Sequence, residues 1–450
     1  NKEIRIFGDR VIMMEEGEVT VGNFRFIGKN FTLPYDEFKL TMETIDTVLF
    51  AVQDPKNPNI KYDLGGEIKM NAGDLLINHP NNKSGLKKGQ IPGWKKGEIY
   101  ESFPKLKVET GGKIYFDAFY RERFAYHKSQ AYFEIPNIEL DSLTSKTPKF
   151  SGTFYSNIFP PIKEELVAIY DPKYNGVESK YALGFVHRPK KPLKLYQTKA
   201  ELKADSIVMY KTGLVASGKN LEIKNHTYTL KAESVVLTPD SVHTKKANIL
   251  VKQGKSGNTA YPEALGENLK LSWYTTKLVG SDTLKIDSLT LKNSAKDFIR
   301  IFDDKNPASL SGTMAITPNA LWAIGKFTRK DFFLFAPQGA IITPDRIFTP
   351  DLPDNIVEFK VHSTDLDPFN VDYGTDYKHI VDANAIFVDF DLKKSICKIS
   401  HNPLISQQSP QYEFFSFPYA QFKTSIKEAI WDVKKKEITM KGDENTIFHA

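Results

Sequence analysis

The sequence is poor in cysteine: Cys397 is the only one among 450 residues. A single thiol excludes an internal disulfide framework and a zinc site built from several thiolates. It fits an intracellular protein as well as one from a Gram-negative envelope. Cys397 stands in the alternating segment 395–399, which favours a small buried or edge residue over a nucleophile.

Long apolar runs are also lacking. The richest one, Phe332 to Ala336, is stopped by Pro337 and falls far short of the roughly 18 residues that a membrane-spanning helix needs. The sequence therefore predicts no transmembrane helix. It starts at Asn1 without a basic, apolar and small-residue signal series, which predicts a processed or excised piece of a longer parent chain.

Charge of one sign and catalytic motifs are scarce as well. The 61 Lys and Arg against 55 Asp and Glu give a net charge of +6, too small to predict a nucleic-acid partner. The nine histidines form no His-Glu-x-x-His pair, and no Gly-x-Ser-x-Gly elbow occurs. No catalytic residue is predicted, and we expect a protein that is not an enzyme. A polysaccharide-active enzyme remains a remote alternative, because two catalytic carboxylates can lie far apart in sequence.

Alternation with period two is what the sequence has in abundance. Ile207 and Met209 fall on one side of a short run, as do Leu221 and Ile223, and turn residues recur about every 8 to 12 positions. The pattern predicts an all-β fold of repetitive antiparallel strands, arranged as an elongated jelly roll or solenoid or as stacked sandwiches. A short helix is expected at 161–168, where Pro161 would occupy the first turn.

Internal similarity supports repetition. Residues 28–48 align without a gap on 218–238, and Phe390 to Lys394 resembles Trp431 to Lys435, an aromatic strand end followed by a charged turn. Thr-Pro-Asp or Thr-Pro-Asn occurs at 238–240, 317–319 and 343–345 and predicts three similar strand ends. Ordinary β patterning with coincidental turns is the alternative. A basic, proline-containing linker or crossover at 188–192 is predicted to separate a region 1–187 from a repetitive region 193–450.

Three successive segments carry a family resemblance. Residues 204–210 give a small residue, Asp and an alternating strand closed by Tyr; 216–223 form a Gly-bearing strand; and 228–233 a further strand, with a similar look at 431–438. This series resembles the strand repeat of the OstA-like family of periplasmic lipopolysaccharide-transport proteins. Residues 150–161 and 183–185 are similar to stretches of very large, uncharacterised β-rich envelope proteins of Bacteroidota. The resemblances imply a place in the bacterial envelope, periplasmic or associated with the outer membrane, and a longer parent protein, without a known activity.

These observations favour two alternative functions. In the first, an open groove or sheet edge formed by 204–237 and 385–440 engages lipid, lipopolysaccharide, or a β-rich envelope partner. The speculative groove residues are Ile207, Met209, Leu221, Ile223 and Tyr228. In the second, the protein is a surface adhesive or glycan-binding module that uses loops such as 81–96 and 365–376.

One acidic segment is a speculative calcium site. Its oxygen ligands would come from Asp365, Asp367, Asn370, Asp372 and Asp376. Phe369 stands where the third ligand of the standard loop would be expected, so a polar loop bearing Pro and Gly is the alternative. No other cofactor is predicted.

Overall fold

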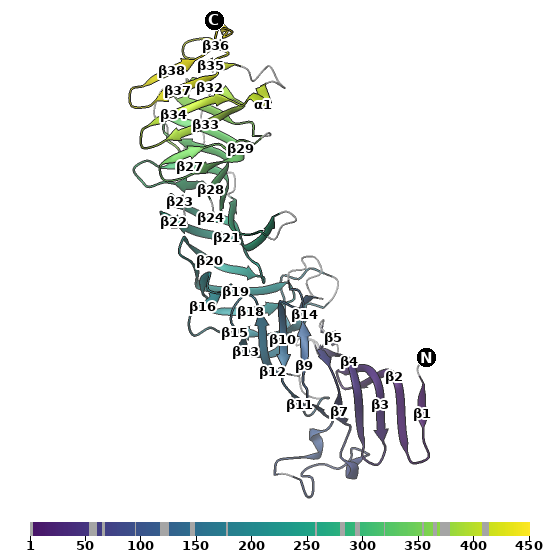
Figure 1. Cartoon of the computed structure of the whole chain (residues 1–450). Coiled ribbons are helices and arrows are strands. Elements are labelled where there is room, and N and C mark those ends of the chain that lie inside the picture. Colours follow the sequence, from purple (N-terminus) through teal and green to yellow (C-terminus); the bar gives the residue numbers. More distant parts are fainter. Residues whose placement is uncertain are drawn as a thin grey trace. The chain divides into compact units, whose positions relative to one another are not determined.

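The chain is built almost entirely of antiparallel strands (Figure 1). The computed structural model describes residues 3–450 except 54–60, 65–67, 95, 118–125, 145–148, 177–178, 257–258, 280–283, 293–297, 319, 353–354, 363–366, 370–378 and 407–413. Within these residues the helical elements are short: the turns η1 (Pro80–Asn82) and η2 (Tyr100–Ser102) and the helix α1 (Pro403–Ser406). The predicted all-β, antiparallel fold is confirmed.

The chain divides into two compact units. Unit 1 comprises residues 1–199, 204–217 and 236–240, and unit 2 comprises 200–203, 218–235 and 241–450. The segment 188–192, expected as a linker, connects β15 to β16 inside unit 1.

The strands of unit 1 are β1 (Ile4–Ile6), β2 (Val11–Val21), β3 (Phe24–Pro34), β4 (Lys39–Gln53), β5 (Lys61–Asp63), β6 (Ile68–Met70), β7 (Gly73–Leu76), β8 (Lys105–Val108), β9 (Gly112–Tyr115), β10 (Ala131–Ile135), β11 (Ile138–Leu140), β12 (Phe150–Ser156), β13 (Ile162–Tyr170), β14 (Tyr181–Gly184), β15 (Val186–His187), β16 (Leu193–Leu195) and β18 (Ser206–Tyr210). Residues of β19 (Gly213–Lys224) and β20 (Tyr228–Leu237) fall in both units.

The strands of unit 2 are β17 (Ala200–Lys203), β21 (Ser241–Val251), β22 (Gly254–Ser256), β23 (Thr259–Tyr261), β24 (Ala264–Val279), β25 (Leu284–Lys292), β26 (Ile299–Ile301), β27 (Ala308–Ile316), β28 (Leu321–Arg329), β29 (Phe332–Ile342), β30 (Arg346–Phe348), β31 (Glu358–His362), β32 (His379–Asn384), β33 (Ile386–Asp391), β34 (Ile396–His401), β35 (Phe415–Phe417), β36 (Phe422–Thr424), β37 (Glu428–Asp432), β38 (Glu437–Lys441) and β39 (Phe448–His449).

Unit 1 begins with four strands side by side, β1 to β4, in chain order (Figure 1). Alternate residues of β3 and β4 point to one face, where Phe24 stacks on Phe26 and Phe50 with ring centroids 6.1 and 5.7 Å apart. All three rings are buried. The period-two pattern therefore produces an aromatic core on one side of this sheet.

The prediction of a helix at 161–168 is wrong, because most of this segment belongs to the strand β13. Leu166 lies opposite Phe150, and Ile162 lies opposite Phe154, in an antiparallel pair with β12. Apolar residues four positions apart fit a helix as well as alternate positions of a strand. Pairing with the aromatic residues of β12, which lie nearby only in the folded chain, decides for the strand.

Unit 2 contains two layers of strands that share β29. One runs β29–β31–β32–β35–β36–β39 and the other β30–β33–β34–β37–β38. Aromatic rings meet between the layers: Phe332 lies 5.4 Å from Phe390, and Phe359 lies 6.4 Å from Trp431, measured between ring centroids. All four side chains are buried, so the space between these layers is a filled core.

The turns predicted from sequence follow strand ends as expected. The three Thr-Pro-Asp or Thr-Pro-Asn segments come directly after β20, β27 and β29. The two similar aromatic–aspartate segments are matching hairpins: Asp391 accepts a hydrogen bond from the backbone of Lys394 at 2.9 Å, and Asp432 from that of Lys435 at 3.0 Å. The last loop residue has a positive φ in both, 60° at Ser395 and 56° at Lys436.

Successive turns are joined by one recurring backbone hydrogen bond, which we call the turn ladder. In unit 2 the N–H of Leu392 donates to the carbonyl of Asp345 at 2.9 Å, and that of Val433 to the carbonyl of Ser395 at 3.0 Å. In unit 1 the N–H of Tyr35 donates to Arg10 at 3.0 Å. In each case the donor is the first residue of a loop, and the acceptor is the last loop residue before the neighbouring strand.

Candidate functional site

The five predicted groove residues are buried. Ile207 and Met209 of β18 lie in unit 1, and Leu221, Ile223 and Tyr228 lie in unit 2; all are at most 3% exposed. Tyr228 packs edge-on against Trp273, with ring centroids 5.8 Å apart. These side chains therefore contribute to the cores of their units and do not line an open groove.

The calcium prediction falls mostly outside the described residues. Four of the five predicted ligands lie outside the described residues: Asp365, Asn370, Asp372 and Asp376. Asp367 is described, and its carboxylate accepts a hydrogen bond from the backbone N–H of Phe369 at 3.0 Å. Within the part of the chain that the structure describes, no group of three or more His, Cys, Asp or Glu side chains is placed to hold a metal ion.

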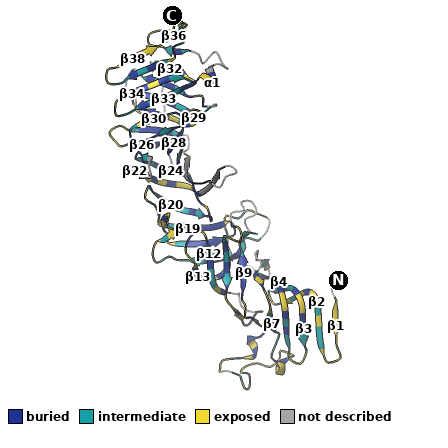
Figure 2. Cartoon of the chain, in the orientation of Figure 1, coloured by how far each residue is buried: buried dark blue, intermediate teal, exposed yellow. Residues whose placement is uncertain are grey.

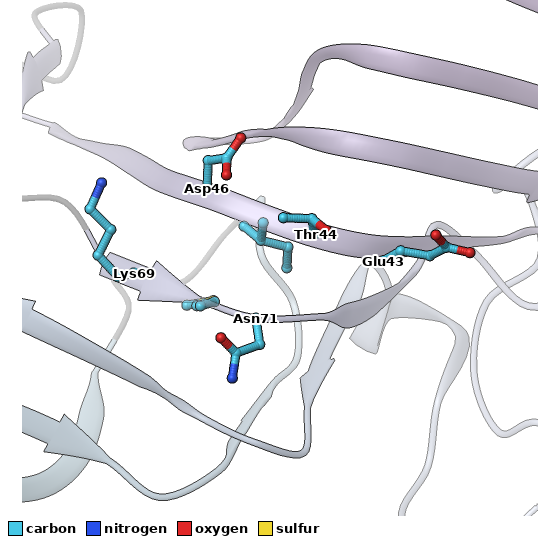
Figure 3. A pocket seen from close by; sticks show the side chains of 7 residues that line it. Glu43, Thr44, Asp46, Lys69 and Asn71 are labelled. Carbon is cyan, nitrogen blue, oxygen red and sulfur yellow. The ribbon is translucent and has the colours of Figure 1, made fainter.

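A shallow pocket of about 410 Å³ lies in unit 1, beside the part of β4 where its pairing partner changes from β7 to β6. Asp46 is an extra residue of a β-bulge, because Thr47 pairs with Ile27 while Ile45 pairs with Gly28. The pocket is lined by Glu43, Thr44, Ile45, Asp46, Lys69, Met70 and Asn71 (Figure 3).

The polar side chains of this pocket diverge. Figure 3 shows Asp46 and Asn71 pointing to opposite sides, and Glu43 lying at the end away from Lys69. The Lys69 ammonium donates to the Thr47 hydroxyl at 3.4 Å. Bulges often redirect a side chain at a functional site, but here no two carboxylates converge on one point. The pocket supplies no acid and base pair for hydrolysis.

Three tyrosines lie side by side on the solvent-facing side of the neighbouring strands β9, β10 and β12. Tyr132 lies opposite both Tyr115 and Tyr155, with ring centroids 6.4 and 5.2 Å away. The ammonium of Lys113 lies 5.0 Å from the Tyr132 ring, and that of Lys128 lies 5.5 Å from the Tyr115 ring. Neighbouring rings and lysine ammonium groups already contact these tyrosines, which is the usual way that cross-strand pairs stabilise a sheet.

Two histidines face each other in unit 2. His362 of β31 lies opposite His379 of β32, with ring centroids 5.1 Å apart. Burial, followed by the charges of His379 and Lys360, lowers the pKa of His362 to about 4. Burial and then Lys360 also lower the pKa of His379. Both rings are therefore neutral at neutral pH.

This pair predicts acid sensitivity of unit 2. An unfolded histidine binds a proton near its usual pKa of 6.5, whereas folded His362 does so only near pH 4. Its contribution to stability is thus complete above about pH 6.5 and is lost as the pH falls toward 4. We expect His362→Gln to weaken the dependence of the urea midpoint on pH between about pH 7 and pH 4.5. His449→Gln, at an exposed position, is the control; equal pH dependence in His362→Gln and the native protein would contradict the prediction.

An exposed apolar surface lies on the strand β1. Ile4 and Ile6 are 62% and 76% exposed. Ile4 lies opposite Met14, which lies opposite the buried Phe31, so these side chains share the core face of the sheet. Figure 2 shows the colours changing from buried to exposed toward β1. β1 is the terminal strand of its sheet order.

The backbone of β1 is oriented for further pairing. Phe7 donates its N–H to Val11 at 2.9 Å, so Phe7 and alternate residues face β2. In an antiparallel pair the intervening residues direct their N–H and C=O groups to the other side. Ile4 and Ile6 therefore present these groups away from β2.

A second exposed strand, β38, lies in unit 2. Met440 is 39% exposed, although the residue opposite it, Ala429, is completely buried. Ile438 lies opposite Trp431 on the same core face. The carbonyl of Lys441 accepts from the N–H of Lys427 at 3.0 Å and thus faces β37, so Ile438 and Met440 direct their backbone groups outward.

The sequence matches no family model, no curated protein and no solved structure. Among the described residues no helix is long and apolar enough to cross a bilayer. Sequence reasoning included β38 within 385–440 but missed β1. The available signal was the alternation of Ile4 and Ile6 with charged neighbours.

Proposed function

We propose that this chain is a non-enzymatic structural and binding segment of a bacterial cell-envelope protein, and that it binds a β-rich partner by extending its sheets at exposed edges. The observation that supports the proposal best is β1, whose apolar side chains continue the core face while its backbone groups point outward. Such edges recruit strands, because main-chain hydrogen bonds supply affinity and alternate side chains supply specificity.

The envelope location rests on the OstA-like resemblance of 200–240 and 380–440. A lipid groove built from Ile207 and its four companions is less favoured, since an acyl chain would have to displace packed side chains. Pairing of a partner strand with an exposed edge needs no such displacement of packed side chains. It uses surface that is already exposed.

Charge placed on the edges tests the proposal. We expect the double variant Ile6→Lys, Met440→Lys, produced in a bacterial envelope, to lose its co-purifying protein partner at least about tenfold, because an edge lysine opposes strand addition. The matched control is Leu86→Lys, at a loop position that is 82% exposed. The measurement is the stoichiometry of partner protein and of extractable lipid by mass spectrometry. Stoichiometric lipid, or a partner retained by the double variant, would contradict edge pairing.

A further inference from the structure

We infer that this chain forms a dimer through a two-stranded arm of unit 2, which pairs with the same arm of a second copy. The arm is the part of β24 and β25 beyond the pair Tyr274–Ser288, and its described residues are 275–279 and 284–287. This inference goes beyond the proposed function, since it involves neither β1 nor β38. Three features of the described residues support it: the ends of the neighbouring strands, the direction of the backbone groups of β25, and the residues that would face each other.

The arm extends past both strands that flank it. β21 begins opposite Tyr274, and β27 ends opposite Leu289. A Thr-Pro-Asp turn precedes β21 and a Thr-Pro-Asn turn follows β27, whereas β24 and β25 stay paired as far as Val279 opposite Leu284. Among the described residues, β24 and β25 pair only with each other along the arm. Both long sides of the arm are therefore unpaired edges in the interior of the sequence.

The sheet can close without the arm. Ile316 lies opposite Leu321 across the turn 317–320, and Leu289 lies opposite Ile316 on its other side. Trp273, opposite Leu289, thus stands in the row where the neighbouring hairpin turns. Pairs with and without mutual hydrogen bonds alternate across such a row, so Trp273 and Leu289 form the same kind of pair as Ile316 and Leu321. A turn of four residues could join them directly, and the arm is an addition to the sheet.

The β25 side of the arm presents its backbone groups to a further strand. The N–H of Thr317 donates across its own turn at 2.9 Å, so Ile316 directs its groups to the other side, toward Leu289. Leu289 directs its groups toward Ile316, and residues at intervals of two along β25 point the same way. Lys285 and Asp287 therefore direct their N–H and C=O groups to the side on which β27 has ended.

The base of the arm carries a β-bulge. Between Tyr274 and Lys277, β24 has one residue more than the facing part of β25. Bulges bend a strand and increase its twist, so the arm need not follow the plane of the sheet past the turn 317–320. An added strand can then lie along the arm without meeting that turn.

The residues of the β25 edge select one two-fold register with a second copy. Antiparallel pairing sets outward groups opposite outward groups. With the axis at Ile286, Lys285 of each copy falls opposite Asp287 of the other, and opposite charges in facing positions stabilise a strand pair. An axis at Lys285 or at Asp287 would instead set like charges opposite each other. Ile286 then lies opposite its own copy, in a pair without mutual hydrogen bonds.

The contact uses the same surface on both copies. Such an isologous interface closes on itself, because each β25 edge is used once and none is left for a third chain. The mass of the assembly should therefore rise with concentration and stop at two chains.

A single cysteine tests the register. We expect Ile286→Cys chains to form a disulfide dimer under mild oxidation, identified by its linked peptide, because side chains come closest in a pair without mutual hydrogen bonds. The matched control is Ser288→Cys, whose two copies would lie four positions apart, about 13 Å along the strands and beyond the reach of a disulfide. It should link at least about tenfold less. Equal linking at the two positions would overturn the register. Cys397 is buried and is kept in every variant.

Reversal of charge tests the facing pairs. We expect Lys285→Asp to weaken the dimer at least about tenfold in sedimentation, because two-fold symmetry makes both attractive pairs repulsive. Asp287→Lys should act in the same way. The double variant Lys285→Asp, Asp287→Lys again sets opposite charges across the axis and should return the dimer to within about threefold of its native strength. A double variant as weak as the single ones would overturn the pairing of these positions.

Removal of the arm separates the dimer from the edges used in the proposed function. Replacement of residues 274–288 by Thr-Pro-Asn-Ala, the sequence of the turn 317–320, should keep the circular dichroism of a folded β protein and leave a monomer. The variant Ile6→Lys, Met440→Lys should dimerise as the native chain does. A dimer that persists without the arm, or is lost in the Ile6→Lys, Met440→Lys variant, would overturn the arm as the contact. A native chain that stays monomeric and gives no Ile286→Cys crosslink would overturn the dimer and leave partner binding at β1 and β38 standing.

Discussion

Replacing Phe332 by Ala is expected to lower the free energy of unfolding of unit 2 by about 4 kcal/mol, as for other large aromatic side chains removed from a core. Phe332 is completely buried. Its ring centroid lies 5.3 Å from that of Phe359 in one layer and 5.4 Å from that of Phe390 in the other. The substitution removes these contacts at once and leaves a cavity between the layers.

Urea unfolding followed by circular dichroism measures the change. The matched control is Phe333→Ala, one residue further along β29, where the side chain is only half-buried on the opposite face. We expect it to cost less than half as much, since less apolar surface leaves the protein interior. Equal losses at the two positions would show that Phe332 is not a central core residue.

Asp171→Ala should cost unit 1 about 3 kcal/mol, because three hydrogen bonds to a buried carboxylate would be lost. Asp171 is 1% exposed. Its carboxylate accepts from the backbone N–H and the hydroxyl of Thr212, at 2.8 and 2.7 Å, and from the N–H of Lys173 at 2.9 Å. These bonds hold the turn after β13 against the turn that joins β18 to β19.

Thermal unfolding of unit 1 is the appropriate measurement. Asp9→Ala, at an exposed turn of the same unit, serves as the control and is expected to change stability by less than about 0.5 kcal/mol. A loss below about 1 kcal/mol for Asp171→Ala would mean that water replaces the carboxylate at little cost.

Local patterns carried most of the fold prediction. Period-two alternation predicts strands because successive side chains point to opposite faces, and Thr-Pro-Asp predicts a strand end because proline fixes one turn dihedral. The hairpins at Asp391 and Asp432 were predictable for the same reason: the aromatic strand end and the charged loop lie together in the sequence.

Features that depend on register could not be predicted in this way. The segment 161–168 forms a strand because β12 lies beside it, and His362 meets His379 because β31 pairs with β32. The alternation of Ile207 and Met209 predicted an inward face, but it could not distinguish an open groove from a filled core. That distinction depends on side chains that distant strands supply.

The turn ladder would allow unit 2 to be lengthened by duplication of a segment of its sequence. Asp391 and Asp432 occupy equivalent places in successive hairpins, 432 − 391 = 41 residues apart, and each loop makes the same backbone contact with the loop before it. An in-frame duplication of this 41-residue segment would add one hairpin to its layer, extending it by about 10 Å, twice the spacing between strands. The flanking hairpins would meet the loop geometry that they meet now. Insertion of a single residue within a strand would instead turn every following side chain to the wrong face.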